Sequence, residues 1–135
     1  MKKILAIVDD VYEDLELWYP CRADIAYYAM KTAEFDALLV PGGFAPDKMR
    51  RRPEVLDVVR EMNRSGKLIA LISAGILRGR HATSTVGIRD DMVNAGALWA
   101  DKELVRDGNL ISSRTPADLH VFAKAIVDWL KEPRQ

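Results

Sequence analysis

The sequence is poor in cysteine and has no excess of either charge. Cys21 is the one cysteine among 135 residues, so the chain cannot form an internal disulfide. This usage is typical of proteins that work in a reducing compartment. The 20 basic residues equal the 20 acidic ones. Because binding to a phosphate backbone usually requires a basic excess, the balance argues against nucleic acid as a partner.

Long apolar runs are also missing. The amino-terminal run from Ile4 to Val8 is five residues long, which is too short for a membrane span or for the hydrophobic region of a secretion signal. We therefore expect a cytoplasmic protein with no membrane partner. A chain of 135 residues has room for one domain around one core.

The sequence does contain short apolar runs that are bounded by charged or turn-forming residues. Three of them, at residues 4–8, 36–40 and 67–72, indicate strands buried on both faces of a parallel sheet. His81–Ser84 predicts a further short strand. Residues 103–105 and 110–113 flank Asp107-Gly108, a pair that favours a β-hairpin.

Helices are predicted at residues 13–19, 53–64 and 117–130. Pro53 suits the first turn of the second helix, and Gly66 suits the position after its end. The residues expected to face the core are Val55, Val58, Val59 and Met62 in the second helix and Leu119, Phe122, Ala123, Ile126 and Trp129 in the third. Strands that alternate with helices predict an α/β fold, a three-layer sandwich with a mostly parallel, flavodoxin-like sheet flanked by helices.

Two connections are shorter than this arrangement requires. A crossover between neighbouring parallel strands takes at least about 10–12 residues, yet only residues 73–80 separate Ile72 from His81. The connection from Val11 to Pro20 is also tight. We therefore expect a single domain, residues 1–135, that is interrupted at Ile72/Ser73 and also near Pro20/Cys21.

Five blocks of sequence, in order along nearly the whole chain, resemble the PfpI family of intracellular cysteine proteases, within the class I glutamine amidotransferase-like superfamily. Each block alone is a weak signal, whereas the ordered set is specific. The blocks are Tyr12-Glu13-Asp14-Leu15-Glu16-Leu17 with Tyr19-Pro20, residues 34–47 around Pro41-Gly42-Gly43, Ser73-Ala74-Gly75-Ile76-Leu77-Arg78-Gly79-Arg80, residues 88–96, and residues 105–114.

The resemblance implies a cysteine-dependent hydrolase of small peptides or of dicarbonyl and glycated substrates, which forms homo-oligomers and uses no cofactor. In the family, the strand that matches Leu68–Ile72 runs into a Cys-His-Gly-Pro-type turn and a helix. Here Ile72 joins Ser73 directly, so the nucleophilic cysteine and its adjacent histidine are absent from the sequence. Relatives likewise carry the rest of a helix, a strand and a hairpin where Pro20 is followed directly by Cys21.

Three supporting site residues remain. Glu13 matches the family acid that keeps the cysteine reactive, although an acid in the first turn of a helix is also a common structural feature. Gly43 follows a buried strand, where ligands of open α/β sheets bind, and its amide could stabilise an oxyanion; a plain Pro-Gly turn is the alternative. Asp47 matches an acid that reaches a neighbouring subunit's site, or it is an exposed loop residue.

Other reactive side chains favour structural interpretations. Cys21 follows Tyr19-Pro20 rather than a buried strand, so we expect a core or strand-edge cysteine. His81 and His120 lie far from it in sequence, and the spacing predicts no metal site. Residues 50–52 are three arginines, which indicates a solvated face or a subunit contact rather than a phosphate site.

Two functions follow from these observations. The first is a PfpI-like hydrolase, an intracellular peptidase or a glyoxalase- or deglycase-like enzyme, whose nucleophile segment is not in the printed sequence. The second is a non-catalytic, stress-related or assembly protein of the same fold. A protein that truly lacks a central helix would expose apolar sheet surface and lose stability, so we favour the first.

Overall fold

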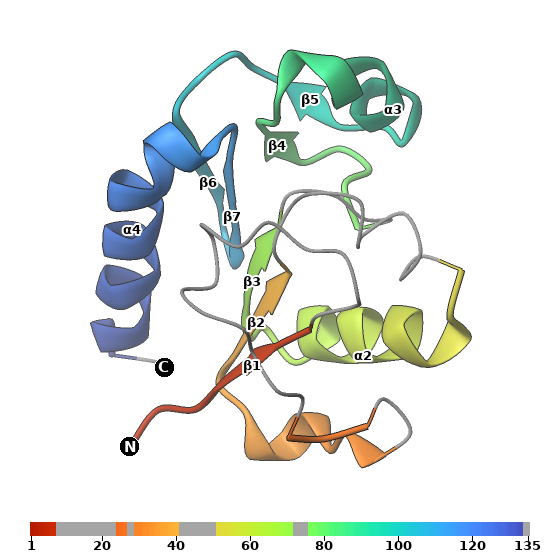
Figure 1. Cartoon of the computed structure of the whole chain (residues 1–135), viewed down its shortest axis with the longest axis vertical. Coiled ribbons are helices and arrows are strands. Elements are labelled where there is room, and N and C mark those ends of the chain that lie inside the picture. Colours follow the sequence, from red (N-terminus) through yellow and green to blue (C-terminus); the bar gives the residue numbers. More distant parts are fainter. Residues whose placement is uncertain (8–23, 27–28, 41–50, 72–75, 134–135) are drawn as a thin grey trace.

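A computed structural model describes residues 1–7, 24–26, 29–40, 51–71 and 76–133 of the chain. Its main sheet has five strands in the order β1-β2-β3-β7-β6 (Figure 1). The strands are β1 (Ile4–Ala6), β2 (Ala37–Val40), β3 (Leu68–Leu71), β6 (Leu104–Asp107) and β7 (Leu110–Ser113). All neighbours are parallel except the β6–β7 pair. The mostly parallel sheet with helices on its faces confirms the predicted α/β sandwich.

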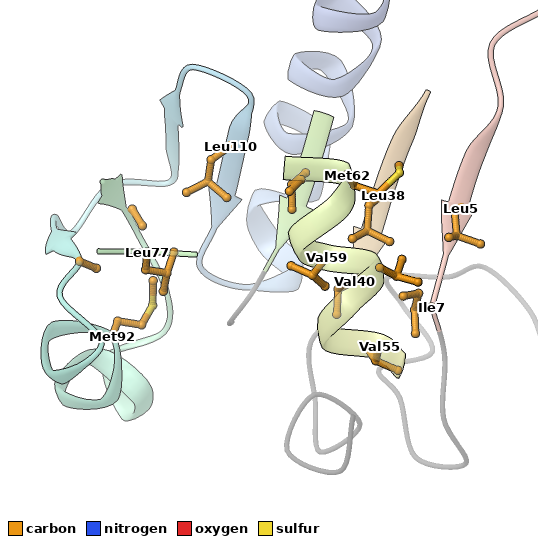
Figure 2. Close-up of a cluster of buried hydrophobic side chains, with 14 residues drawn as sticks. Leu5, Ile7, Leu38, Val40, Val55, Val59, Met62, Leu77, Met92 and Leu110 are labelled. Carbon is orange, nitrogen blue, oxygen red and sulfur yellow. The ribbon is translucent and has the colours of Figure 1, made fainter. Parts of the chain in front are cut away.

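The apolar strand residues alternate between two cores, one on each face of the sheet. Leu38, Ile69 and Leu110 belong to the cluster that contains α2 (Pro53–Arg64), and Figure 2 shows this cluster. Leu68 and Ile111 belong to the second cluster, which contains α4 (Leu119–Lys131). Because both side-chain directions are buried, β3 is a continuous apolar run, as predicted.

β1 differs from the prediction that it is buried on both faces. Leu5 is buried, but Ile4 and Ala6 on either side of it are exposed. The reason is position: β1 is at the end of the described sheet and pairs with β2 alone. Val8, the last residue of the predicted strand, lies outside the described residues, as does the helix predicted at 13–19.

Helix α2 follows the prediction in its bounds and in its buried face. Val55, Val58, Val59 and Met62 are all buried. Gly66 lies directly after the C-cap residue Ser65 with φ of +64°. This left-handed conformation ends the helix and is one that glycine adopts without a Cβ penalty.

The carboxyl-terminal elements confirm the hairpin and correct one residue of the last helix. β6 and β7 are antiparallel and are joined by Gly108-Asn109. Pro116–Asp118 forms a 3-10 turn that leads into α4. Ala123 was expected to face the core but is exposed, and Ala125 packs there instead. Phe122, which directly precedes Ala123, is buried. Successive residues of an α-helix lie about 100° apart around its axis, so Ala123 faces away from the core.

β4 (His81–Ala82) does not join the main sheet. It pairs in parallel with β5 (Leu98–Trp99) in a separate two-stranded sheet, next to α3 (Arg89–Asn94). Neither α3 nor β5 was predicted. The segment after β3 would be too short for a crossover only if β4 belonged to the same sheet as β3, as predicted, and that prediction is wrong. The connection from β3 to β4 therefore needs no crossover of the main sheet.

Candidate functional site

The carboxyl ends of β1, β2 and β3 meet at one edge of the sheet. The register aligns Ala6 with Leu39 and Leu39 with Ala70, so the chain leaves three neighbouring strands side by side. In sequence, the segments that follow these ends carry Glu13, Gly43 and Ser73. Ligands of open α/β sheets bind outside the carboxyl ends of the strands, which makes this edge the candidate site.

The structure does not place the residues predicted for that site. Glu13, Gly43 and Asp47 lie outside the described residues, and so do Cys21 and both predicted junctions. That Glu13, Gly43 and Asp47 lie close together at this edge of the sheet therefore stays a prediction. The described part of the chain contributes the strand ends and the residues beside them.

β7 brings two buried hydroxyl groups to the same edge. It runs parallel to β3 with Ser112 opposite Leu71, and both Ser112 and Ser113 are 2% exposed. The N–H of Thr83, which follows β4, donates to Ser112 Oγ at 3.0 Å. This bond joins the small sheet to the main one beside the end of β3.

A second pair of bonds holds the small sheet from within. Trp99 Nε1 donates to Ser84 Oγ at 3.0 Å, and the Ser84 hydroxyl donates to the Thr85 carbonyl at 3.0 Å. Ser84 is fully buried. The Arg89 guanidinium lies 5.2 Å from the Trp99 ring centroid, within cation–π range. Every one of these groups is used internally, so none is an exposed nucleophile.

The connection from β5 to β6 is fastened at three successive residues. Arg114 Nη1 donates to Asp101 Oδ1 at 2.8 Å, the Thr83 hydroxyl donates to the Lys102 carbonyl at 2.8 Å, and the Ser113 hydroxyl donates to the Glu103 carbonyl at 2.8 Å. We call residues 101–103 the clamped loop. Its backbone is therefore bonded both to Thr83, directly after β4, and to Ser113 of β7.

Arg114 also reaches into the start of the last helix. Its Nε donates to Asp118 Oδ2 at 3.1 Å, and the Asp118 side chain is only 9% exposed. The hydrogen bonds from Arg114 hold the pKa of Asp118 below its usual value, and they raise the pKa of Arg114 in turn. Arg114 also bonds Asp101, and Asp118 also accepts from the Thr115 hydroxyl at 3.4 Å, so we interpret this partly buried pair as structural.

The remaining candidates lie apart from this edge. His81 is exposed at the start of β4, and its backbone N–H donates to Asp107 Oδ2 at 2.6 Å. His120 is exposed on α4, with Nδ1 at 3.2 Å from the Ala117 carbonyl. Arg51 and Arg52 are exposed before α2. Among the described residues, no three His, Cys, Asp or Glu side chains gather as a metal site would require.

Sequence reasoning missed the hydroxyl groups and the clamped loop. Ser112, Ser113 and Arg114 were noted only as part of a matching block. Their partners come from three separate segments, and a polar residue gives no sign in the sequence that it will be buried. The one signal was the Ser112-Ser113 pair that follows Leu110-Ile111 within the predicted strand, with Arg114 directly after it. In the part of the chain that the structure covers, no helix has the length and apolarity needed to span a membrane.

Comparison with known proteins identifies relatives over nearly the whole chain. Deglycase PfpI of Pyrococcus furiosus is 44% identical over 121 positions, which cover 84% of this chain and 73% of that protein. A deglycase of Pyrococcus abyssi is 36% identical over 165 positions, covering 96% of this chain and 99% of that protein.

Solved structures agree with these relatives. A protein of Anabaena variabilis with DJ-1/PfpI-like and ferritin-like domains has a TM-score of 0.91 and 35% identity over 96% of this chain. The chain spans about half of that two-domain protein, 48%. Drosophila melanogaster DJ-1beta has a TM-score of 0.82 and 25% identity, with 96% of this chain and 91% of that one covered.

The alignments also show that this chain is shorter than its relatives within the matched region. The P. abyssi alignment has 165 positions, whereas 96% of 135 residues is only about 130. About 35 positions of that relative therefore face no residue here. The same comparison for P. furiosus, 121 positions against about 113 residues, leaves about 8. These counts agree with internal shortening, but they do not locate it at the two predicted junctions.

The sequence profile of the DJ-1/PfpI family matches residues 21–129, which is most of the chain. Together with the end-to-end relatives and the shared sheet, this match agrees with the resemblance found in the sequence. The chain belongs to the DJ-1/PfpI family.

Proposed function

We propose that this protein is a PfpI-type hydrolase that acts on glycated or dicarbonyl groups at the carboxyl edge of β1, β2 and β3. The observation that carries the proposal is the 44% identity to Deglycase PfpI over 84% of the chain. Hydrolysis of small peptides is the alternative reaction on the same site. We further propose a homo-oligomer in the cytoplasm, as the family resemblance implies.

The proposed chemistry needs a thiolate at the end of β3. The thiolate would attack the carbonyl carbon of the substrate, and the amide of Gly43 would stabilise the oxyanion that forms. Glu13 would keep the sulfur reactive, and Asp47 would complete the site of a neighbouring subunit. In a peptide, collapse of this adduct would break the bond to the amine, which would take up a proton and leave, and water would then hydrolyse the resulting thioester to a carboxylic acid and the free thiol. In a glycated amine, the bond to the amine would break in the same way and a hydrogen would pass between the two carbons of the dicarbonyl unit, so that water releases a 2-hydroxy acid and restores the thiol.

The printed sequence offers no such thiol, because Ile72 is followed by Ser73. The catalytic form must therefore contain residues between these two positions that the printed chain omits. The shortfalls of about 8 positions against Deglycase PfpI and about 35 against the P. abyssi deglycase support omitted residues within the chain. On this proposal the described sheet is the scaffold, and the omitted segment carries the nucleophile.

The test is an intact mass spectrum of the protein isolated from its own source, together with a thiol count under denaturing conditions. A mass above 15.2 kDa and more than one thiol are expected. Release of sugar from glycated amino acids should then be lost when the additional cysteine is changed to serine. A mass of 15.2 kDa with a single thiol would contradict the proposal.

The second candidate is a non-catalytic stress-related or assembly protein of the same fold. The observation that favours it is that the one thiol in the sequence, Cys21, does not follow β3. This alternative would be established by a chain of 15.2 kDa that has neither deglycase nor peptidase activity. The Cys21→Ser variant should then have the same stability and the same oligomeric state as wild type.

A further inference from the structure

The turn of the β6–β7 hairpin contains the one aspartate of the sequence that is followed by glycine. The pair is Asp107-Gly108, and no asparagine is followed by glycine. Because glycine has no side chain, its main-chain nitrogen can approach the carboxyl carbon of the preceding residue with little hindrance. At Asp57-Val58 and Asp118-Leu119, by contrast, a branched side chain shields that nitrogen. Asp107 is therefore the acid best placed in the sequence for attack by the next peptide nitrogen.

The turn is also open to water. Gly108 is exposed, and the Asp107 side chain is 31% exposed. No backbone carbonyl among the described residues accepts the N–H of Gly108. Both reacting groups thus lie at the surface, where water can carry protons to and from them. The turn lies at the amino end of β3, where Leu110 pairs with Ile69, so it is separate from the candidate site at the carboxyl ends of the strands.

Contacts from the start of the small sheet hold the Asp107 carboxyl group. The backbone N–H of His81 donates to Oδ2 at 2.6 Å, and Arg80 Nη2 lies 3.9 Å from Oδ1. The same Arg80 nitrogen donates to the Asp107 carbonyl, and Nη1 donates to Asn63 Oδ1 at 3.3 Å. Attack by the Gly108 nitrogen would require the carboxyl group to leave His81 and turn toward the main chain. These contacts therefore oppose the reaction in the folded protein.

We propose that Asp107 is a site of isoaspartate formation, and that Arg80 and the His81 N–H restrain this reaction in the folded protein. The Gly108 nitrogen bonds to Asp107 Cγ and gives up its proton, and one carboxyl oxygen leaves as water, so that a succinimide ring forms. Water then adds to one of the two ring carbonyls. When it breaks the bond between the main-chain carbonyl carbon of Asp107 and the Gly108 nitrogen, the chain continues through Cγ and the former main-chain carbonyl becomes a free carboxylate. The reaction leaves the mass unchanged and needs neither an oxidant nor the proposed enzyme activity.

Isomerisation would change the geometry of the hairpin. The isomer has one more carbon, Cβ of Asp107, in the main chain of the turn. Asp107 pairs with Leu110, and Val105 pairs with Ser112, and a longer turn does not fit this register. The His81 N–H would also lose its carboxylate acceptor. We therefore expect the isomerised chain to be less stable than the unmodified one.

The experiment is to age the recombinant 135-residue chain at neutral pH, at a temperature well below its unfolding midpoint, and in parallel in concentrated guanidinium chloride. Peptides from a protease digest are compared with synthetic standards that contain aspartate or isoaspartate at position 107. The isoaspartyl form should accumulate at Asp107 and exceed that at Asp57 and Asp118 in both samples. In the folded sample it should form about tenfold more slowly or less, because the turn must open first.

Arg80→Lys tests the restraint on the carboxyl group. Lysine keeps the positive charge but lacks the planar fork that donates to both Asp107 and Asn63. In the folded variant, isoaspartate at Asp107 should form about three times faster than in wild type, or more. In guanidinium chloride the variant and wild type should react at the same rate, because the contact is absent from both.

Two further variants separate this contact from general effects. Arg64→Lys makes the same replacement where the side chain is 72% exposed, and it should age like wild type. Val55→Ala creates a cavity on the buried face of α2, at the other end of the helix from Asn63. Its isoaspartate rate should stay near that of wild type, even though urea unfolding should show a lower global stability.

Three outcomes would overturn the proposal. The first is that Asp107 forms no more isoaspartate than Asp57 does, in wild type and in Arg80→Lys alike. The second is an equal rate at Asp107 in the folded and the unfolded chain. The third is that Arg80→Lys ages like wild type or no faster than Val55→Ala, because the contacts of Arg80 would then not restrain the reaction.

Discussion

At the scale of single residues, Arg114 connects three parts of the molecule. It bonds Asp101 in the clamped loop and Asp118 at the start of α4, from its own position after β7. Since Asp118 is nearly buried and the guanidinium is planar, this geometry is more specific than an exposed ion pair. Through Arg114, the start of the last helix is therefore linked to the clamped loop.

Asp118→Asn should lower the stability of the protein at neutral pH. The pKa of Asp118 is lower in the folded protein than in the unfolded chain, so the pair contributes stability above about pH 4. That contribution is lost as the pH falls through the lower, folded value. Urea denaturation of wild type and variant should therefore differ at pH 7 and converge as the pH falls through the lowered pKa of Asp118 in the folded protein. Asp24→Asn, at an exposed position, is the control, and a difference that persists at low pH would contradict this role.

Residue-level features of the site could be predicted only where a pattern fixes them. The core face of α2 follows from the helical spacing of Val55, Val58, Val59 and Met62, and all four are buried. Glu13, Gly43 and Asp47 came from the family resemblance, and their geometry is still a prediction. The bonds of Thr83 and Ser112 could not be foreseen, because hydroxyl groups pair across segments distant in sequence.

At the scale of elements, the β6–β7 hairpin depends on its turn. Gly108 has φ of +57°, a conformation that L-residues adopt at a cost because Cβ approaches the carbonyl oxygen. A Cβ there would also lie 3.5 Å from Arg80 Nη2. Arg80 itself bonds the Asp107 carbonyl and Asn63, so the turn is tied to the end of α2.

Gly108→Ala should destabilise the protein by about 1 kcal/mol, mainly from the left-handed backbone. Gly87→Ala is the matched control, since Gly87 has no positive φ and a Cβ there meets only Thr85 Oγ1 at 3.7 Å. Equilibrium unfolding in urea measures both variants. Equal effects at the two positions would show that the turn conformation is not the cause.

Element predictions failed where pairing partners decide the outcome. The apolar run of β1 indicated a strand buried on both faces, but burial also depends on how many neighbours a strand has. The strand predicted at His81–Ser84 is confirmed only for His81–Ala82, and the prediction that it belongs to the main sheet is wrong. The local sequence favours an extended backbone at this segment. Which sheet the strand joins depends on its pairing partner β5, which was not predicted.

At the scale of the whole molecule, the sheet has one core on each face. Met62 is fully buried in the cluster with α2, and Phe122 is buried in the cluster with α4. The strands between them supply side chains to both. Because the two cores share one sheet, loss of packing on either side should weaken the same cooperative unit.

Met62→Ala and Phe122→Ala should each cost about 2–5 kcal/mol through lost burial and the cavity that remains. Both should lower the midpoint of one thermal transition seen by calorimetry and by circular dichroism alike. Arg60→Ala, on the exposed face of α2, should change stability by less than about 0.5 kcal/mol. Two separate transitions in either core variant would show that the faces fold independently.

The separate location of β4 has a consequence for protein engineering. The segment between β3 and β4 leaves one sheet and enters another, so its length is not tied to the hydrogen-bond register of the five main strands. Loops of different sizes can be grafted between Ile72 and Ser73 with little expected strain on the scaffold. A library of cysteine-containing loops inserted at this position could be screened for thiol-dependent enzyme activity.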